Sequence, residues 1–411
     1  MRKINLLILT ISCSLIYGNG LSYLDEFNFT YSNWVHHPKF AYRIIGVGAG
    51  VLNNSFTLNQ YNRFSGAFLD EPAKLEILSS IPTNGLWLNA GATLTGLDIF
   101  FNNFGFSIFG NGTISTKIPK DVFDLALYGN ELNRQYEVDD LAARTLSYWA
   151  ASLSYNLKIK SKIHLAGAIR YLGGIYLFET LESHGYLLTT PNFFVSEGKA
   201  TYRLGNGGSG FGLDLILNYD VSQKLQTTLA LFNLNSGINW AGNSENGYLN
   251  FTLDSINWSQ LQKGDFFQGN STVTSIAPFR TPLPFYIALG ANYQINPFLK
   301  GSLYLSQSFN ESQLTTRAPM LSSNIELRWL RWLPIEVGAS LGGKEGFGFG
   351  YSLGVIIKKF SGSFAIKDLG GFFLGAKGTT ASFAFGYNLY PEIIRGSNAL
   401  HLRGTPEQSR N

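Results

Sequence analysis

Residues 283–310, LPFYIALGANYQINPFLKGSLYLSQSFN, decide how the fold is predicted. Across 285–295 apolar residues occupy every second position, and small or polar residues fill the positions between them. Side chains on a strand alternate between its two faces, so this segment has one apolar and one small, polar face. Asn296-Pro297 is a turn signal, and the alternation resumes at Leu299. The stretch therefore predicts a β-hairpin.

The composition indicates where such hairpins are used. Charged residues make up 14% of the chain, against about 25% in an ordinary soluble protein, while aromatic residues reach 15% and there are 45 glycines. After residue 17 the chain lacks a run of the ~18 apolar residues that a transmembrane helix needs. Low charge, many aromatic residues and period-two alternation are typical of a transmembrane β-barrel, with apolar residues toward lipid and polar or small residues toward the lumen.

Counting the alternating segments predicts the size of the barrel. Besides the two strands of the opening hairpin, we expect strands at 41–52, 93–101, 104–112, 144–158, 162–173, 209–220, 224–234, 320–330, 333–342, 347–359, 362–368 and 380–389. If 174–208 is one outer loop with a small hairpin of its own, long and short connections alternate throughout, with short ones near 102, 160, 222, 296, 331 and 360. Outer-membrane barrels have an even strand number, short periplasmic turns and longer extracellular loops. The sequence predicts an all-β, antiparallel up-and-down transmembrane barrel of about 14 strands within residues 41–390.

The first residues predict export. Arg2 and Lys3 precede an apolar run at 4–17 and a small-residue site at 18–20, the pattern of a secretory signal peptide spanning residues 1–20. Cys13 is the only cysteine, so the mature chain would have neither a disulfide nor a cysteine-ligated metal. A lipoprotein signal at Cys13 is a less favoured alternative, because the residues around it fit that signal poorly.

Two segments outside the alternation complete the predicted organisation. Residues 21–40 show no clear period and predict an N-terminal extension, and residues 391–411 predict a flexible polar tail. The formal net charge of +4 gives no indication of a nucleic-acid partner.

The first two long connections predict short helices. Asp70 can cap a helix at 71–79 with Pro72 in its first turn, and a second helix at 119–128 ends at Gly129-Asn130. These helices have two interpretations, because an amphipathic face suits either setting. They can fold into the lumen as a plug, or they can be ordinary extracellular loop helices.

The parity of each strand also gives the candidate site residues. Inward positions carry the polar residues His164, Arg170, Asp214, Asn218, Asn292, Glu326, Arg328 and Glu336. A polar pathway for a ligand is one interpretation, and a lumen network that neutralises itself is the favoured one, because any such barrel has a polar interior. Trp149, Trp329 and Trp332 are interpreted as anchors at the membrane interfaces.

An enzyme is disfavoured. His164 with Ser152 or Ser154 is a chance combination in a serine-rich chain, since a catalytic triad is defined by its geometry. We therefore predict no catalytic residue, no metal site and no cofactor.

Short motifs resemble a family of outer-membrane barrels known only as a domain of unknown function. They are Asn54-Ser55-Phe56-Thr57-Leu58, Tyr61-Asn62, Ile81-Pro82, Gly85-Leu86, Ile118-Pro119-Lys120, Tyr128-Gly129-Asn130 and Arg170-Tyr171-Leu172-Gly173-Gly174. The strand count, the N-terminal extension and the early helices resemble the long-chain fatty-acid transporter (FadL-like) barrels. The resemblance implies a bacterial outer-membrane location and passage of hydrophobic molecules, and it leaves the substrate open because no fatty-acid-binding residues match.

Two functions follow as hypotheses. The first is a passive transporter of small hydrophobic molecules, embedded in outer-membrane lipid, whose lumen is plugged by residues 21–40 or by the helix at 71–79. The glycine-rich stretches 46–50 and 370–375 would be its weakest wall segments. The second is a structural barrel that anchors a partner protein, without conducting, through a long polar loop at 235–282.

Overall fold

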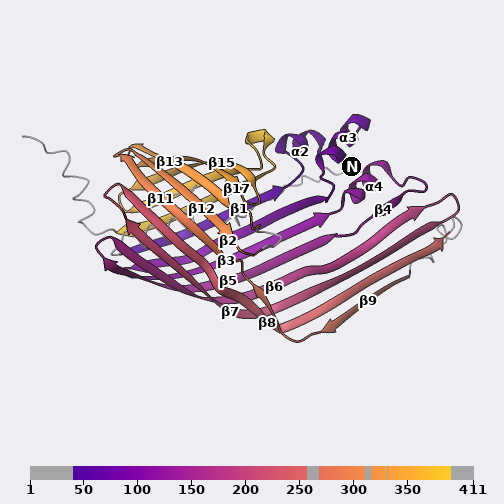
Figure 1. The fold of residues 1–411 in the computed structure, drawn as a ribbon, viewed down its shortest axis with the longest axis horizontal. Helices are drawn as coiled ribbons and strands as arrows, with labels where there is room; N and C mark the ends of the chain where they lie inside the picture. The colour runs from indigo at the N-terminus through magenta and orange to yellow at the C-terminus, as the bar shows by residue number, and fades with distance from the viewer. Residues whose placement is uncertain (1–39, 257–267, 311–315, 331, 390–411) are drawn as a thin grey trace, which may run out of the picture.

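The computed structural model describes residues 40–256, 268–310, 316–330 and 332–389. Its strands form one antiparallel sheet that closes on itself (Figure 1). Closure comes from β1 (Phe40–Asn53), which pairs with β2 (Leu86–Phe101) on one side and with β17 (Gly378–Leu389) on the other. The predicted signal peptide at 1–20, nearly all of the predicted extension at 21–40 and the tail at 391–411 lie outside the described residues.

The barrel wall has 14 strands, which confirms the predicted fold class. The other wall strands are β3 (Phe104–Ile118), β5 (Ala142–Lys160), β6 (Ile163–Thr189), β7 (Phe194–Asp220), β8 (Leu225–Ile256), β11 (Tyr286–Asn296), β12 (Leu299–Ser308), β13 (Met320–Leu330), β14 (Leu333–Gly342), β15 (Gly346–Ile357) and β16 (Phe360–Leu369). The opening hairpin is β11 and β12, in which Leu289 lies opposite Leu305 and Asn292 opposite Ser302. Like faces therefore meet across the ladder, as the alternation predicts.

Short turns define one end of the barrel, which we call the turn end. The strand bounds place them at 102–103, 161–162, 221–224, 297–298, 331–332 and 358–359, where the sequence predicted short connections. Asn102 and Lys358 adopt positive φ angles of 51° and 56° in these turns. Such angles are the ones that tight hairpin turns require.

The opposite end, which we call the loop end, carries the helices. They are α2 (Leu58–Phe64), α3 (Glu71–Ser80), α4 (Lys120–Tyr128) and the 3₁₀ turn η1 (Phe373–Gly375). The carboxylate of Asp70 caps α3 by accepting a hydrogen bond from Ala73 N at 3.0 Å, and Pro72 lies in its first turn. Helix α4 ends at Gly129, whose φ of 74° favours glycine. None of the described helices is long and apolar enough to cross a membrane.

Three wall strands continue far past the barrel at the loop end (Figure 1). Strands β6 and β7 have 27 residues each and β8 has 32, whereas about 9–11 residues span a bilayer. The short strand β4 (Gln135–Glu137) pairs with β6, and β9 (Gln268–Ser275) pairs with β8. We call the part of β6, β7 and β8 beyond the barrel, with β4 and β9, the outer sheet.

The outer sheet corrects two expectations about loops. The stretch 174–208 does carry a hairpin, but that hairpin is the continuation of β6 and β7 around a tip at 190–193. The polar loop predicted at 235–282 is wrong in its described part, because residues 235–256 continue β8 and β10 (Phe279–Pro282) pairs back onto it. Asn, Ser and Gly in this stretch resemble loop composition, yet their backbone groups are satisfied by ladders with β7, β9 and β10.

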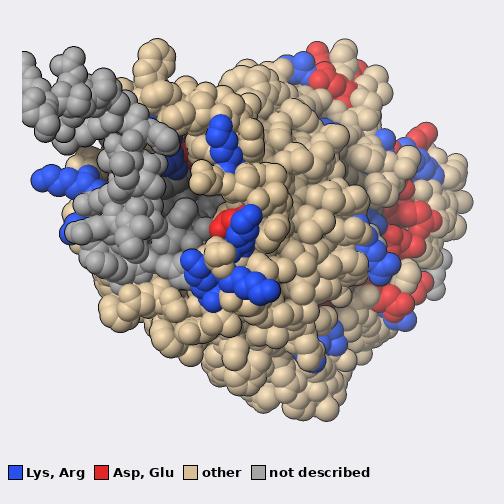
Figure 2. Space-filling model, turned by 60° about the vertical axis from the view of Figure 1, so that its left-hand side comes forward, with Lys and Arg blue, Asp and Glu red and all other residues tan. Residues whose placement is uncertain are grey.

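The two faces of the wall differ as period two requires. Outward positions expose large apolar side chains, such as Leu153, Ile169 and Leu289, while the alternate positions are buried and mostly small or polar. Charged residues in Figure 2 gather in two groups, one near each end of the molecule, and a broad uncharged surface separates them. This is the arrangement of a barrel with an apolar outer band.

Candidate functional site

The interior of the barrel brings Arg170 and Asp214 together. Arg170 Nη2 donates hydrogen bonds to Asp214 Oδ1 at 2.7 Å and to Asn233 Oδ1 at 2.5 Å. The backbone N–H of Asn233 donates to the same Asp214 oxygen at 2.8 Å. Arg170 and Asp214 are only 9% and 7% exposed, so the two charges face each other away from bulk water. We call these three residues the interior clamp, and sequence reasoning missed Asn233.

The clamp spans three strands and reaches a fourth segment. Arg170, Asp214 and Asn233 come from β6, β7 and β8, and Asn233 Nδ2 donates to the carbonyl of Pro284 between β10 and β11 at 2.7 Å. Asn233 has a φ of 59°, a left-handed conformation that asparagine tolerates better than most residues. The positive φ of Asn233 inside a strand marks it as unusual, but this angle is set by the tertiary structure and could not be predicted from the sequence.

A second interior charge group lies near the turn end. Arg328 forms an ion pair with Glu326, and Glu326 lies directly opposite Glu336 on β14 and Lys300 on β12. Two facing carboxylates would repel each other, so the cations Lys300 and Arg328 stabilise this pairing. Ser352 Oγ donates to Glu336 Oε2 at 3.4 Å. The sequence analysis named Glu326, Arg328 and Glu336, and it left out Lys300 and Ser352, although the same parity places them inward.

The remaining predicted polar residues are buried and take part in hydrogen bonds or ion pairs. His164 Nε2 lies 3.5 Å from Asp220 Oδ2, and Asn218 Oδ1 accepts a hydrogen bond from Thr228 at 2.9 Å. Asn292 Oδ1 accepts hydrogen bonds from Ser302 Oγ at 2.7 Å and Tyr304 Oη at 2.9 Å.

The structure does not bring the serine candidates to His164. Ser154 lies opposite Ala168, and Ser152 opposite Arg170. His164 is four positions along β6 from Ala168, a separation of roughly 13 Å at 3.3 Å per residue. Among the described residues no group of three or more acidic, histidine or cysteine side chains could hold a metal ion.

A buried ion pair beside the barrel seam is one of those that escaped the sequence analysis. Arg43 Nη2 lies 2.6 Å from Asp98 Oδ2, and Ser107 Oγ donates to Asp98 Oδ1 at 2.6 Å. The three residues come from β1, β2 and β3, next to the seam at which the barrel closes. Their partnership depends on the register between neighbouring strands, which the alternation of each strand alone does not give.

The three predicted interface tryptophans are all exposed, and they lie at different ends. Trp149 packs against Tyr171 with ring centroids 5.5 Å apart, on the side of the barrel that leads to the outer sheet. Trp329 and Trp332 lie beside the short turn between β13 and β14. This separation fits anchors at two opposite interfaces.

An apolar cluster lies on the inner side of the wall toward the loop end. We call it the inner apolar cluster, and its buried members are Phe109, Leu146, Tyr148, Ala150, Leu172, Leu177, Ile238, Trp240 and Leu283. Trp240 is fully buried, and its indole Nε1 donates to Thr281 Oγ1 at 2.9 Å. A Cβ added at Gly174, Gly205 or Gly208 would approach the Trp240 ring to 2.7–3.0 Å, so these glycines make room for it.

The wall is irregular beside this cluster. The β7–β8 register shifts between Phe211 and Leu213 and again between Leu213 and Leu215. On the other side of β8, pairing with β11 ends at Phe232 and resumes with β10 at Gly237. We call residues 233–236 with 283–285 opposite them the wall break.

The glycine-rich segments expected to be the weakest parts of the wall do not coincide with the wall break. Residues 46–50 pair with both β17 and β2 without a register shift, and residues 370–375 form a loop after β16 that does not belong to the wall. Glycine permits irregularity without causing it.

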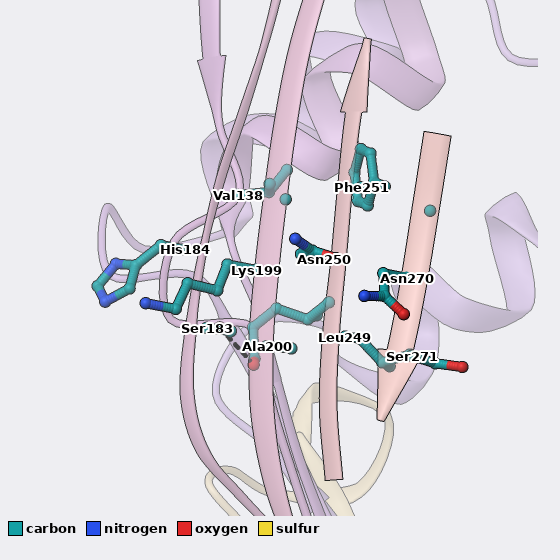
Figure 3. A pocket seen from close by; sticks show the side chains of 13 residues that line it. Val138, Ser183, His184, Lys199, Ala200, Leu249, Asn250, Phe251, Asn270 and Ser271 are labelled. Atoms are coloured by element: carbon teal, nitrogen blue, oxygen red, sulfur yellow. Dashed lines mark hydrogen bonds between the residues drawn. The ribbon is translucent and has the colours of Figure 1, made fainter. Parts of the chain in front are cut away.

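An open cleft of about 430 Å³ lies in the outer sheet (Figure 3). We call it the outer cleft. Most of its surface is apolar, and its apolar side chains are Val138, Leu141, Ala200, Leu249 and Phe251. The Phe251 ring lies against Gly198, where an added Cβ would be 2.1 Å from the ring. His184 and Lys199 extend from one side of the cleft, away from Phe251 (Figure 3).

Comparison with protein families gives one match. The model of a family of unknown function (DUF5723) matches residues 38–204 and 196–366, which is more than half of the chain. The chain therefore belongs to this family, which confirms the resemblance to an uncharacterised barrel family. A search of curated proteins gave no match.

Several solved structures are similar to this chain at low sequence identity. The toluene transporter TodX of P. putida is 10% identical, covers 88% of this chain and 92% of its own, and has a TM-score of 0.50. The toluene transporter TbuX of Ralstonia pickettii is 12% identical over 87% and 94%, with a TM-score of 0.47. A Pseudomonas aeruginosa FadL homologue is 12% identical over 87% and 94%, with a TM-score of 0.45.

Proposed function

We propose that this family member is a bacterial outer-membrane barrel through which small hydrophobic molecules pass without an energy source. The inner apolar cluster carries the proposal. A water-filled porin has a polar interior, whereas here the inner wall toward the loop end is filled by packed apolar side chains, among them the fully buried Leu172, Leu177 and Trp240. An apolar molecule that moves from water to a position between such side chains gains roughly 25 cal/mol per Å² of its own apolar area removed from water. The shared fold with the toluene transporter TodX supports the same class.

The proposed path connects three features of the structure. A molecule first meets the outer cleft, most of whose surface is apolar. It then reaches the inner apolar cluster and leaves sideways at the wall break, between 233–236 and 283–285. Regular pairing of β8 with β11 and β10 stops on either side of that point. The described hydrogen bonds that must separate there run from Leu283 N to Ser236 O and from Asn233 Nδ2 to Pro284 O.

The early chain is proposed to close the lumen at rest. Helices α2 and α3 act as one unit at the loop end, because Gln60 Nε2 donates to Glu76 Oε1 at 3.3 Å and Arg63 forms an ion pair with Glu76. Helix α3 also contacts α4, so the unit lies beside the connection that leads to the outer sheet. The predicted N-terminal extension at 21–40 is the other candidate plug.

Planar-bilayer conductance tests the closed lumen. We expect little steady conductance from the intact mature protein, and a larger one from at least one folded deletion, of residues 21–40 or of 70–80. A large, stable conductance in the intact protein would reject the plug.

Uptake into liposomes tests transport itself. Aromatic hydrocarbons and fatty acids are supplied outside liposomes that contain the wild type, Leu172→Asn or Leu153→Asn. Leu172 belongs to the inner apolar cluster and Leu153 faces outward on β5. We expect Leu172→Asn to slow uptake about tenfold, as a polar group in the path costs about 1–3 kcal/mol of desolvation, and Leu153→Asn to leave uptake near wild type. Equal rates for all three and for empty liposomes would reject transport.

A scaffold barrel that anchors a partner protein is the second candidate. The specific observation is β9, which within the described residues pairs with β8 alone and leaves its other edge open. Natural edge strands usually carry charges or proline against unwanted pairing, and Gln268–Ser275 has neither. An extended partner segment could add to this edge. Uptake no faster than in empty liposomes, together with a closed lumen in both deletions, would favour this candidate.

A further inference from the structure

We propose that the loop between β16 and β17 is a rigid anchor that inserts into the lipid head-group region at the loop end. The inserting side chains are Phe372, Phe373 and Leu374, which we call the aromatic knob. This inference rests on the proposed outer-membrane location, and it does not depend on transport.

The loop folds over the outward face of the wall. On β16, Phe364, Ile366 and Asp368 alternate with the buried inward positions Ala365 and Lys367, so Asp368 belongs to the outward row. Asp368 is nevertheless only 6% exposed. Its Oδ2 accepts a hydrogen bond from Phe373 N at 2.9 Å, which places the loop on top of the carboxylate. An exposed charge on the lipid face is unfavourable, and the loop replaces it with apolar surface.

The backbone of the loop is strained and firmly held. Phe373 has a φ of 48°, a left-handed conformation that bulky residues rarely adopt. Gly370 has a φ of 66°, and a Cβ on Gly371 would lie 2.2 Å from the carbonyl oxygen of Gly375. Strained residues persist only where their surroundings fix them, and they concentrate at functional positions.

Contacts on both sides fix the loop. Lys377 N donates to Leu369 O at 2.8 Å, which closes the base of the loop. Leu58 N, at the start of α2, donates to Ala376 O at 2.8 Å, and Ala376 is fully buried. The knob is therefore presented by a braced loop, which lowers the ordering cost of inserting it into lipid.

The strain exposes three apolar side chains in one place. Phe372, Phe373 and Leu374 are 45%, 55% and 59% exposed. The Phe372 and Phe373 ring centroids lie 4.2 Å apart, and Phe372 packs edge-on against Phe349 at 4.7 Å. The knob thus continues an existing apolar surface of the wall.

The occupant of this surface is lipid, because Phe349 belongs to the outward row of β15. That row also includes Tyr351 and Leu353. Strand β15 has 12 residues, slightly more than the ~9–11 that span a bilayer, and Phe349 lies near its loop-end terminus. Aromatic side chains at this depth prefer the interface between acyl chains and water.

Site-directed spin labelling measures the depth of the knob. The chain has one cysteine, Cys13, so a Cys13→Ser background allows single labels at Phe373→Cys, Leu353→Cys and Val273→Cys. Leu353 is the lipid-facing reference, and Val273, on β9 of the outer sheet, is the aqueous one. The protein is reconstituted in phosphatidylcholine vesicles, and relaxation by oxygen is compared with relaxation by a water-soluble nickel complex. We expect the oxygen-to-nickel ratio at 373 to exceed that at 273 severalfold and to approach that at 353.

The outcomes separate the knob from the proposed location. A label at 373 that matches 273 while 353 remains in lipid would overturn the anchor alone. Water exposure at 353 as well would overturn the outer-membrane location and the anchor with it. Asp368→Leu removes the acceptor for Phe373 N, and we expect it to raise the mobility of the label at 373 severalfold. An unchanged spectrum would show that Asp368 does not hold the knob in place.

Discussion

Replacing Arg170 or Asp214 alone should lower the unfolding free energy far more than replacing both residues together. Arg170 and Asp214 are both nearly buried, with 2.7 Å between Nη2 and Oδ1. In Arg170→Leu the Asp214 carboxylate retains the Asn233 N–H donor but loses its cation. A buried charge without its partner costs about 3–5 kcal/mol of unfolding free energy, and Asp214→Leu should cost a similar amount. The double variant Arg170→Leu/Asp214→Leu buries no unpaired charge, so we expect it to cost less than about 2 kcal/mol.

Reversible urea unfolding in lipid vesicles, followed by tryptophan fluorescence, gives the four free energies of this cycle. The expected coupling between the two residues is several kcal/mol, since the cost of the double variant falls well below the sum of the single ones. Ser152→Ala, at the position opposite Arg170 on β5, is a control for general disturbance of this wall. Additive single costs would refute the reasoning, because they would mean that water inside the barrel solvates each charge independently.

The barrel wall, the helices α2 and α3 at the loop end and the outer cleft each give a further prediction. Leu217→Arg and Leu289→Arg should each cost about 2–4 kcal/mol of unfolding free energy in the same assay. Ser306→Arg, at a half-buried inward position of β12, should cost much less, and equal costs would show that the faces are wrongly assigned. The hydrogen bond from Arg63, with a further one from Gln60, holds the pKa of Glu76 below its ordinary value of 4.5. The contribution of Glu76 to stability is therefore present above that value and lost as the pH falls through the lower folded pKa. Proteolysis between α2 and α3 should accelerate at acid pH in the wild type and show no such dependence in Glu76→Gln. Gly198→Val would place side-chain atoms against the Phe251 ring and narrow the outer cleft, so uptake should fall at least severalfold. Lys199 faces the other way, and Lys199→Val should leave uptake near wild type. Equal uptake by the two variants would show that the outer cleft is not part of the path.

Local chemistry was sufficient for the wall strands and their turns. In β11 the alternation of Leu289 and Ala291 with Gly290 and Asn292 predicts the strand and assigns its two faces. The cap at Asp70 and the stop at Gly129 likewise place α3 and α4, because capping involves only neighbouring residues. Parity also selected Arg170 and Asp214 as interior residues, although parity alone does not pair one with the other.

The outer sheet could not be predicted from local sequence patterns. Residues 235–256 are polar and glycine-rich, and they are a strand only since β7, β9 and β10 supply hydrogen-bond partners. Strand formation in such a segment is decided by pairing with distant residues, and intrinsic preference contributes little.

By itself, the sequence determined a closed barrel of 14 strands with an apolar outside, a polar inside and short turns at one end, because each of these follows from period two and from turn residues. Only the tertiary structure decided where the interior becomes apolar, which residues pair across it and where the wall is irregular. Trp240 meets Leu172 and Leu177, and Asn233 meets Arg170 and Asp214, through strand registers that are set between segments tens of residues apart. A one-residue change of register would exchange the inner and outer faces, so these contacts belong to the closed barrel as a whole.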